Sequence, residues 1–347
     1  MQQVDIILPS YNSEKFIDEC IESIRSQSFS NFNVLVIDNG SSDKSLESIR
    51  KWCKEDSRVE LIANKENLGA LGSIIKGFNI SKAEYLMFLP ADDRLGKEFL
   101  SLTVNGLKEH PNAAFAYTSS KMSAIDANTQ VIGEKTRRVP HYESGEYCEP
   151  ASLMLNYYTG IPLIRKSVYE KLGGFNSGFL QAADYDLYIR AAALHNSVYI
   201  DSLQQQSLKH ENQLSKQYQK TGRAFWDSNK IFQSFFENEN MPTPLRLFAK
   251  TIEFSKFTGS SIAAIAQDFL NSPEALYREF MNTYQDDYLY YCVEAILSQY
   301  SLRKNPNVAV GERYGSVAEA ANISGYLLDR NSKKITELLR YHNLSLS

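Results

Sequence analysis

The sequence predicts an α/β fold with a mixed, mostly parallel sheet flanked by helices, because short apolar runs alternate with helical patterns through its first 95 residues. Two further observations support this fold. Each run ends in a polar or glycine-containing turn. No apolar run approaches the roughly 20 residues that a membrane span requires. We therefore expect parallel strands in one sheet, with the intervening helices on its faces.

The first two units follow the same order of strand, turn and helix. Residues 4–8 form the first apolar run, and Pro9 begins a turn into a helical pattern. Residues 32–38 form the second run, and the turn at 39–43 leads into another helix. The apolar positions expected on the buried faces of the two helices are Phe16, Ile17, Cys20, Ile21 and Ile24, then Leu46, Ile49 and Trp52.

The third and fourth strands are expected at residues 59–63 and 84–89. A turn at 64–69 and a helix through Phe78 connect them. The glycines after the third strand are not spaced as GxGxxG, and the sequence contains no GxxxxGK[ST] motif. The two common phosphate-binding loops of α/β folds are therefore absent from the sequence.

Polar residues lie at or just after the ends of all four predicted strands. They are Tyr11, Asp38, Asn67 and Asp92. Ligands of parallel α/β sheets bind outside the carboxyl ends of the strands, so we expect these side chains to converge on one cleft.

Asp92 and Asp93 are adjacent carboxylates at the end of an apolar strand. Two ionised neighbours repel each other, and a divalent cation with oxygen ligands relieves that repulsion. The alternative is that the pair only opens a helix, since Asp is a preferred N-cap and residues 95–107 have a helical pattern. Both interpretations stay open on these residues alone.

Composition indicates a globular protein that is large enough for two domains. The 347 residues are 43% hydrophobic and 22% charged. A net charge of −4 gives no basic field for binding nucleic acid, so we expect no nucleic-acid partner. Four cysteines without CxxC spacing favour a reducing cytoplasm. The first strand begins at Val4, which leaves no room for a signal peptide and supports the same expectation.

Three motifs in order resemble family 2 glycosyltransferases. They are "ILPSYNSEKFIDECIESIRSQSFSNFNVLVIDNGSSDKS", "ENLGALGSIIKGFNISKAEYLMFLPADD" and "GGFNSGFLQAADYDLYIRAA", and they fall in the first two thirds of the chain. The resemblance implies a GT-A fold, a nucleoside-diphosphate sugar donor with UDP as the usual nucleotide, and Mn²⁺ or Mg²⁺. It also implies transfer with inversion to a saccharide or lipid-linked saccharide acceptor.

The resemblance implies where the two ligands bind along the chain. We expect a glycosyltransferase domain at 1–220, divided into a nucleotide-binding half (1–95) and an acceptor-binding half (96–220). A mostly helical region is expected at 221–347. Tyrosines at 157 and 158, before Ile161, would then line the acceptor pocket or simply pack.

The donor-binding residues implied by the resemblance lie in the first three turns. Pro9, Tyr11 and Asn12 match the loop that shapes the nucleobase pocket. Asp38 matches the acidic residue that contacts the base, although an Asx turn with the following Asn-Gly is the alternative. The matching motifs also assign donor binding to Asn67 and Gly69.

The metal-binding residues implied by the resemblance are Asp93 and His210, with Asp92 directed to the donor. Pro90 stands where many members carry a further Asp, which reduces the expected metal affinity. His210 lies in "LKHENQLS", similar to a family histidine that completes the diphosphate site, but a polar surface or packing role is its alternative.

Asp184 matches the catalytic base of the family, which removes the proton of the acceptor hydroxyl. Ala183 replaces the first acid of the usual pair. The alternative is that Asp184 caps a helix, with Asp186 and Arg190 paired on the outer face of that helix.

The sequence does not decide what the C-terminal region contacts. Leu245, Phe248, Ile252 and Phe257, with basic residues between them, either lie on an anionic membrane at the inner face or form a core face. The tyrosine-rich stretch 284–300 either packs internally or forms the interface of a homodimer.

Two rival functions remain beside the transferase. The missing acids at Pro90 and Ala183 favour an inactive subunit that binds nucleotide sugars. A sugar nucleotidyltransferase would require a glycine-rich, basic loop after the first strand, and residues 9–14 are neither. Processive relatives carry a QxxRW motif, which the sequence lacks, so transfer of one sugar per encounter is expected.

Overall fold

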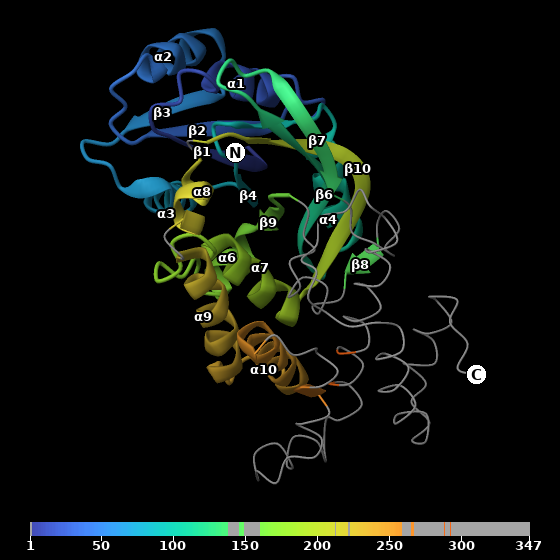
Figure 1. Ribbon diagram of the computed structural model, residues 1–347. Helices are drawn as coiled ribbons and strands as arrows, with labels where there is room; N and C mark the ends of the chain where they lie inside the picture. Colours follow the sequence, from blue (N-terminus) through green and yellow to red (C-terminus); the bar gives the residue numbers. More distant parts are fainter. Residues whose placement is uncertain are drawn as a thin grey trace.

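A ten-stranded mixed sheet forms the centre of the protein, with helices on both faces (Figure 1). The computed structural model describes residues 2–137, 146–148, 160–211, 213–220 and 223–258, with 265–266, 288 and 292. The predicted mixed α/β sheet is confirmed.

The first half of the sheet has the predicted parallel alternation. Its strand order is β3-β2-β1-β4, and all three pairings are parallel. The elements are β1 (Val4–Ser10), α1 (Ile17–Arg25), β2 (Phe32–Asp38), α2 (Ser45–Glu55), β3 (Val59–Ala63), α3 (Gly69–Ile80) and β4 (Tyr85–Phe88). Each strand is a short, mostly apolar run, largely buried in β1, β2 and β4, which explains why the sequence alone located it.

The second half of the sheet continues in the order β9-β6-β10-β5. Its strands are β5 (Asp93–Leu95), β6 (Ala113–Ile125), β7 (Val131–Arg137), β8 (Glu146–Cys148), β9 (Leu163–Arg165) and β10 (Asn196–Lys209). β9 is antiparallel to both β4 and β6, while β10 is parallel to β6. β1, β2, β3, β4, β6 and β10 therefore share one direction, whereas β5, β7, β8 and β9 oppose it.

The helix predicted at 95–107 begins later than expected. Residues Asp93–Leu95 form β5, and α4 runs from Phe99 to Glu109. β5 exists because it pairs with β10, and the Gly96 amide extends this pairing by donating to the carbonyl of Gln204 at 2.7 Å. The polar stretch at 121–138 likewise contains the end of β6 and all of β7, which pair with each other.

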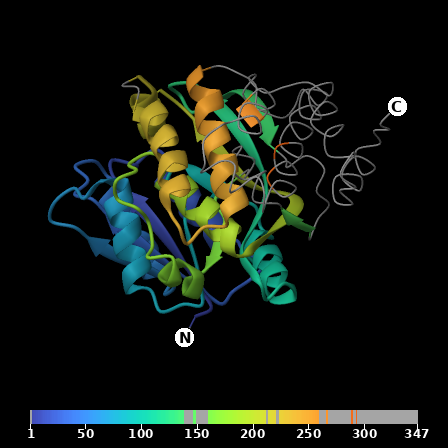
Figure 2. The same cartoon turned by 90° about the horizontal axis from the view of Figure 1, so that it is seen from below.

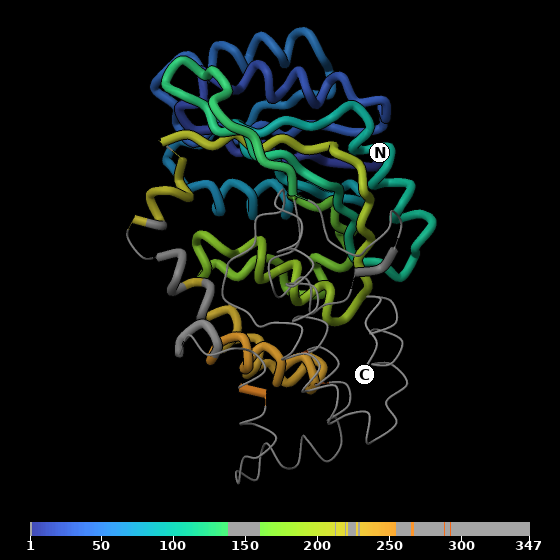
Figure 3. The backbone as a smooth tube through the Cα atoms, turned by 45° about the vertical axis from the view of Figure 1, so that its right-hand side comes forward, coloured from blue at the N-terminus to red at the C-terminus, as the bar shows by residue number. Residues whose placement is uncertain are grey.

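Two apolar cores hold the sheet between its helical layers. One core joins the sheet to α1, α2 and α4 through residues such as Ile21 and Leu100. The other joins it to α3 and to the later helices (Figures 1 and 3). α3 packs closely on β1, because a Cβ at Gly77 would lie 2.6 Å from both γ-carbons of Ile7.

Four of the later helices pack on the second core, namely α6 (Lys166–Lys171), α7 (Ala183–Leu194), α9 (Arg223–Glu237) and α10 (Thr243–Thr258). α8 (Leu214–Lys220) contacts α9. α9 and α10 lie side by side (Figure 2).

The membrane interpretation of the apolar stripe on α10 is wrong. Leu245, Phe248 and Ile252 are buried in the second core, because they pack with α9 and the sheet-side helices. Within the described ranges, no helix is both long and apolar enough to cross a bilayer. The helices predicted at 152–158 and 317–328, and most of the stretch 284–300, lie outside the described residues.

Candidate functional site

Backbone hydrogen bonds bring the first three strand ends together. The Asn39 amide donates to the Ser10 carbonyl at 2.9 Å, and the Asn64 amide donates to the Asp38 carbonyl at 2.8 Å. Since β4 pairs with β1 on its other side, the turns after all four strands lie along one edge of the sheet. This is the edge at which the sequence predicts the ligand.

Side chains lock the first turn to the second. Asn12, which has a positive φ of 49°, donates its amide to Ser41 Oγ at 3.0 Å and accepts from the Ser42 amide at 2.9 Å. One residue later, the Ser13 amide donates to Ser45 Oγ at 2.8 Å. Tyr11, directly before these anchoring residues, is 53% exposed. The two turns therefore form a rigid unit that presents Tyr11 to solvent.

Asp38 forms the Asx turn that the sequence suggested as the alternative to a nucleobase contact. Its Oδ2 accepts the amides of Gly40 and Ser41, each at 3.0 Å, and its Oδ1 accepts the Ser41 hydroxyl. The side chain is fully buried, and Gly40 has a φ of +77° that suits glycine. Both carboxylate oxygens thus serve the turn, and a contact with a nucleobase stays a prediction. Pro9 lies within β1, opposite Ile37.

Asn39 organises the third turn, a role that the sequence analysis did not assign. Its Oδ1 accepts from Asn64 Nδ2 at 2.9 Å and from Ser73 Oγ at 2.8 Å, and its Nδ2 donates to the Gly69 carbonyl at 3.2 Å. Asn67 Oδ1 accepts the Gly69 amide at 2.8 Å. The only sequence signal for Asn39 is its position directly after Asp38.

The fourth turn holds the acidic pair, and β10 brings His210 beside it. Ser207 of β10 pairs with Asp93 of β5, so the end of β10 lies along the turn that carries Asp92. His210 Nε2 is 3.1 Å from Asp92 Oδ2, and Gln213 Nε2 donates to the same oxygen at 3.0 Å. We call Asp92, Asp93, His210 and Gln213 the carboxylate site.

The two carboxyl groups of this site have opposite electrostatic environments. Burial tends to raise the pKa of Asp92, but hydrogen bonds from His210 and Gln213 outweigh it and lower that pKa. Burial and the neighbouring Asp92 charge raise the pKa of Asp93 to about 7. Asp93 Oδ1 accepts the Leu208 amide at 3.2 Å. Asp92 therefore ionises at a lower pH than Asp93.

Residues of α1 support the carboxylate site from behind. The Phe16 ring stacks on His210 with ring centroids 4.9 Å apart. Cys20 is fully buried, and burial raises the pKa of its thiol far above the ordinary range. Cys20 therefore acts as a packing residue and not as a nucleophile.

The donor atoms of the carboxylate site fit a divalent cation. Two carboxylates and an imidazole suit Mn²⁺, and carboxylate oxygens suit Mg²⁺. In this conformation, no three His, Cys, Asp or Glu side chains of the described residues are gathered closely enough to hold an ion. The amide oxygen of Gln213 is buried and has no hydrogen-bond partner among the described residues. The site therefore offers one more oxygen than the sequence predicted.

Asp184 is the second residue of α7, and Ala182 occupies the N-cap position. The expectation that Asp184 caps this helix is therefore wrong. The pairing of Asp186 with Arg190 is confirmed at 2.7 Å, but it is buried and not on an outer face. Arg190 also donates to the carbonyl of Gly174, so the pair ties α7 to the preceding turn. Asp184 is half-buried, and its role as the catalytic base stays a prediction.

Gln205 holds the segment that the sequence assigned to the acceptor. This buried β10 residue accepts the Ile161 amide at 2.8 Å and donates to the Ile161 carbonyl at 2.6 Å. A Cβ at Gly160 would collide with the Gln205 amide. The tyrosines at 157 and 158 lie outside the described residues.

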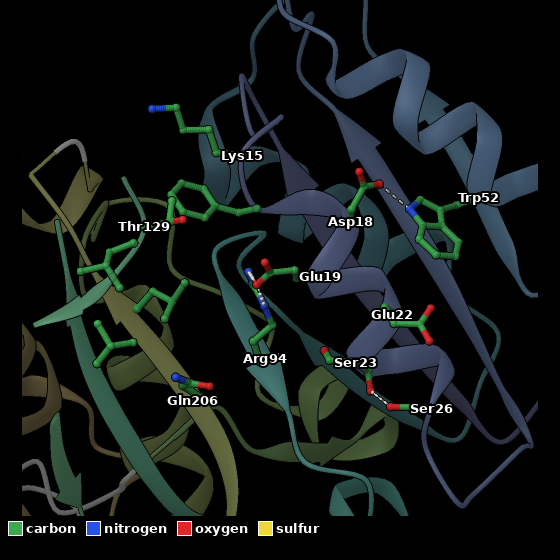
Figure 4. A pocket seen from close by; sticks show the side chains of 14 residues that line it. Lys15, Asp18, Glu19, Glu22, Ser23, Ser26, Trp52, Arg94, Thr129 and Gln206 are labelled. Atoms are coloured by element: carbon green, nitrogen blue, oxygen red, sulfur yellow. Dashed lines mark hydrogen bonds and ion pairs between the residues drawn. The ribbon is translucent and has the colours of Figure 1, made fainter. Parts of the chain in front are cut away.

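An open cleft of about 640 Å³ lies between α1 and the strands β5, β6, β7 and β10 (Figure 4). Glu19 and Arg94 form an ion pair of 2.8 Å in its wall. None of the site residues predicted from the sequence lines this cleft. It shares Phe16 and Leu208 with the surroundings of the carboxylate site.

Comparison with curated proteins identifies relatives that match part of this chain. An uncharacterized glycosyltransferase of Haemophilus influenzae is 28% identical over 196 residues, 55% of this chain and 60% of that protein. An uncharacterized glycosyltransferase of Methanocaldococcus jannaschii, MJ1057, is 28% identical over 248 residues, 66% of this chain and 81% of that protein. The chain thus spans about three fifths of the length of the Haemophilus influenzae relative.

Solved structures show the same fold. Staphylococcus aureus TarS 1–349 in complex with UDP-GlcNAc has a TM-score of 0.59 at 16% identity, covering 94% of this chain and 92% of that one. The mannosyltransferase PcManGT from Pyrobaculum calidifontis, in complex with GDP-Man and Mn²⁺, has a TM-score of 0.51 at 14% identity, covering 95% and 88%. These likenesses show that the sheet has the GT-A architecture.

The family follows from the sequence match taken together with this fold. Residues 5–173 match the model described as Glycosyl transferase family 2. This match covers β1 to β9 and includes the first three turns and the acidic pair. The chain therefore belongs to glycosyl transferase family 2 and is related to bacterial and archaeal glycosyltransferases.

Proposed function

We propose that the chain is an inverting, metal-dependent, non-processive glycosyltransferase of the hexosyl type. It moves a sugar from a nucleoside-diphosphate sugar to a hydroxyl of a saccharide or lipid-linked saccharide. The observation that carries the proposal is the contact between Asp92 and His210, which lies at the edge of the sheet where the sequence predicts the ligand. Family membership supports the reaction class, and this contact supports the proposed location of the site.

The donor is proposed to lie across the four turns of this edge. Tyr11 is exposed and held in place by the locked first and second turns, so it can stack on a nucleobase. The third turn, fixed by Asn39, carries Asn67 and Gly69 beside it. Uridine is the favoured base, and the TarS complex with UDP-GlcNAc is consistent with this choice.

Asp92, Asp93 and His210 are proposed to hold the cation that accompanies the diphosphate. When bound, Mn²⁺ or Mg²⁺ neutralises the negative charge on the departing nucleoside diphosphate. The protein's own share is to present ionised Asp92 in a fixed position. His210 and Gln213 achieve this through their hydrogen bonds to Oδ2.

Asp184 is proposed as the general base. The acceptor oxygen bonds to the anomeric carbon while the bond from that carbon to the diphosphate oxygen breaks, and the hydroxyl proton passes to the Asp184 carboxylate. α7 holds Asp184 rigidly, because the buried pair of Asp186 and Arg190 anchors the same helical turn. Attack from the face opposite the diphosphate inverts the sugar.

A nucleotide-sugar-binding subunit without turnover is the second candidate. Two departures from the family pattern favour it: Pro90 and Ala183 each stand where many members carry an acid. The donor edge would still bind nucleotide in such a protein. Turnover therefore separates the two candidates, whereas binding does not.

The test is a screen of the purified chain against UDP-, GDP- and dTDP-sugars with Mn²⁺, with and without saccharide acceptors. Thermal stabilisation by one donor, together with release of its nucleoside diphosphate, is the expected result. Asp184→Asn should keep the stabilisation and lose the release. Stabilisation without release in the unmodified chain would favour the binding subunit, and no response to any donor would refute both candidates.

A further inference from the structure

Gln213 joins two segments that are distant in the sequence. Its Nε2 donates to Asp92 Oδ2 at 3.0 Å and also to the Leu208 carbonyl on β10. The residue is only 9% exposed, and it lies between the end of β10 and the start of α8. One buried amide therefore connects the acidic turn to the strand that delivers His210.

These two contacts fix the orientation of the amide. Both partners of Nε2 are oxygens that can only accept hydrogen bonds, namely ionised Asp92 and a backbone carbonyl. Turning the amide over would place Oε1 against both of them. The nitrogen therefore faces Asp92, and the oxygen faces elsewhere.

Oε1 of Gln213 is buried and meets no hydrogen-bond donor among the described residues. Buried acceptors in folded proteins are nearly always satisfied, so such an atom calls for an explanation. The missing partner of a carbonyl oxygen is electropositive, either a cation or an N–H or O–H group. The neighbouring residues decide between these classes.

The surroundings favour a cation. The Asp92 carboxylate lies within hydrogen-bonding distance of the same amide, His210 lies against the same carboxylate oxygen, and Asp93 is the next residue of the chain. Divalent cations such as Mn²⁺ and Mg²⁺ take about six ligands, and amide oxygens are among those they accept. An extra oxygen would offset the acid that Pro90 replaces in the family pattern.

We propose that Gln213 supplies its Oε1 to the divalent cation of the donor site, while its Nε2 positions Asp92. The inference rests on the proposed function, because it assigns a further ligand to the same cation. It makes Gln213 a determinant of metal affinity, beyond any role in folding.

The test measures Mn²⁺ binding directly, by electron paramagnetic resonance of free Mn²⁺ during titration with UDP present. Three variants separate the two ends of the amide. Gln213→Met removes both, Gln213→Glu keeps an oxygen and loses the N–H donor, and Gln213→Lys keeps an N–H donor and loses the oxygen. Gln206→Met is the matched control, because Gln206 is a glutamine on the preceding strand, β10, and donates to Ser123 at 2.9 Å instead of to the acidic turn. The melting temperature of each variant in EDTA establishes that it is folded.

The expected result is that Gln213→Met and Gln213→Lys weaken Mn²⁺ binding by roughly 10- to 100-fold. Gln213→Glu should bind Mn²⁺ at least as tightly as the unmodified chain, and Gln206→Met should be unchanged. Equal weakening in Gln213→Met and Gln213→Glu, with Gln213→Lys unaffected, would show that only the N–H end matters and would overturn the ligand assignment. Unchanged affinity in all three variants, with lower melting temperatures, would reduce Gln213 to a structural residue.

The same titration distinguishes this inference from the proposed function. If the unmodified chain binds Mn²⁺ in the presence of UDP and the Gln213 variants bind it equally well, only the role of Gln213 fails. If the unmodified chain binds no Mn²⁺ with UDP, GDP or dTDP, the metal-dependent function fails and this inference fails with it.

Discussion

Asp92 and Asp93 are neighbours in the chain, yet the fold assigns them different ionisation behaviour. Two hydrogen-bond donors face Asp92 and lower its pKa, while burial and the Asp92 charge raise the pKa of Asp93 to about 7. Below about pH 7, a single negative charge is thus favoured where the sequence suggests two. A cation would relieve the repulsion and allow both carboxylates to ionise.

The residue with the clearest catalytic prediction is Asp184. Asp184→Asn should lower the rate of sugar transfer by roughly 10²- to 10⁴-fold, the usual contribution of a general base. Donor affinity should stay within about twofold, because Asp184 lies on α7 and in none of the four donor turns. Single-turnover kinetics measure the transfer rate, and calorimetry with UDP measures the donor affinity. An unchanged rate would move the base to another residue.

The environment of Asp56 predicts how the free energy of unfolding changes at acid pH. Hydrogen bonds from Arg58, at 2.7 and 3.0 Å, together with one from Arg25, lower the pKa of Asp56 from 3.8 to about 2 despite partial burial. The folded pKa lies below the unfolded one, so the stabilisation is complete above about pH 4 and is lost as the pH falls toward 2.

Asp56→Asn should therefore reduce the loss of stability between about pH 4 and pH 2, as followed by urea unfolding. The contribution is expected to be on the order of 1 kcal/mol, since solvent screens such pairs. Glu55→Gln is the control, because Glu55 forms an exposed pair with Lys51 at 3.9 Å. An identical acid-side slope for the unmodified chain and Asp56→Asn would contradict the prediction.

At the scale of elements, α3 depends on the absence of a side chain at one position. A Cβ at Gly77 would lie 2.6 Å from Ile7 Cγ1 and Cγ2, on the fully buried strand β1. Ile is β-branched and cannot swing aside. The helix itself would have to move away from the sheet.

Gly77→Ala should therefore destabilise the protein by roughly 1–3 kcal/mol, the usual cost of overpacking. The gain of about 1 kcal/mol in helix propensity does not compensate for it. Gly133→Ala on β7 is the matched control, since nothing lies within 4 Å of its added carbon. Chemical denaturation of both variants gives the comparison. Equal stability would mean that α3 shifts without cost.

How much of the fold the sequence reveals differs from element to element. β1 to β4 are predictable because each is a short apolar run with a turn at its end. β5 and β7 are not, because β5 has three residues and every residue of β7 is polar, exposed or partly exposed. Their backbone partners, β10 and β6, supply what local sequence lacks. Pairing of distant strands leaves no local pattern.

The residues of the candidate site likewise differ in how far the sequence predicts them. Tyr11, Asp38, Asn67 and Asp92 are predictable as strand-end residues, because the carboxyl ends of parallel strands meet at one edge. Gln213 is not predictable in this manner. Its two partners are Leu208, five residues away, and Asp92, 121 residues away, so only the folded sheet shows that its amide is buried between them.

At the scale of the whole molecule, donor binding should stabilise the entire fold. A ligand that binds only the native state at 100 times its Kd adds about 2.7 kcal/mol. Mn²⁺ with UDP should therefore raise the melting temperature by several degrees, and EDTA should remove the increase. The increase in melting temperature should require Mn²⁺ and UDP together.

Asp93→Asn should separate stability from binding. Its raised folded pKa means that ionising Asp93 costs stability from about pH 4 upward, with the full cost present above about pH 7. At pH 8 without metal, the variant should melt at or above the temperature of the unmodified chain, because it retains an acceptor for the Leu208 amide. It should gain little from Mn²⁺ with UDP. A large metal-dependent gain in the variant would exclude Asp93 as a ligand.

The pairing of β5 with β10 has a consequence for how the protein folds. The acidic turn and His210 are 118 residues apart, so their contact closes a loop that contains β6 to β10. Closing so long a loop is entropically costly, and it follows the assembly of the strands within it. A nascent chain that ends before β10 carries both carboxylates but cannot yet present them with their histidine. Nucleotide binding that depends on this contact would therefore report completion of the sheet, and a pulse-labelled refolding experiment could use it as a late marker.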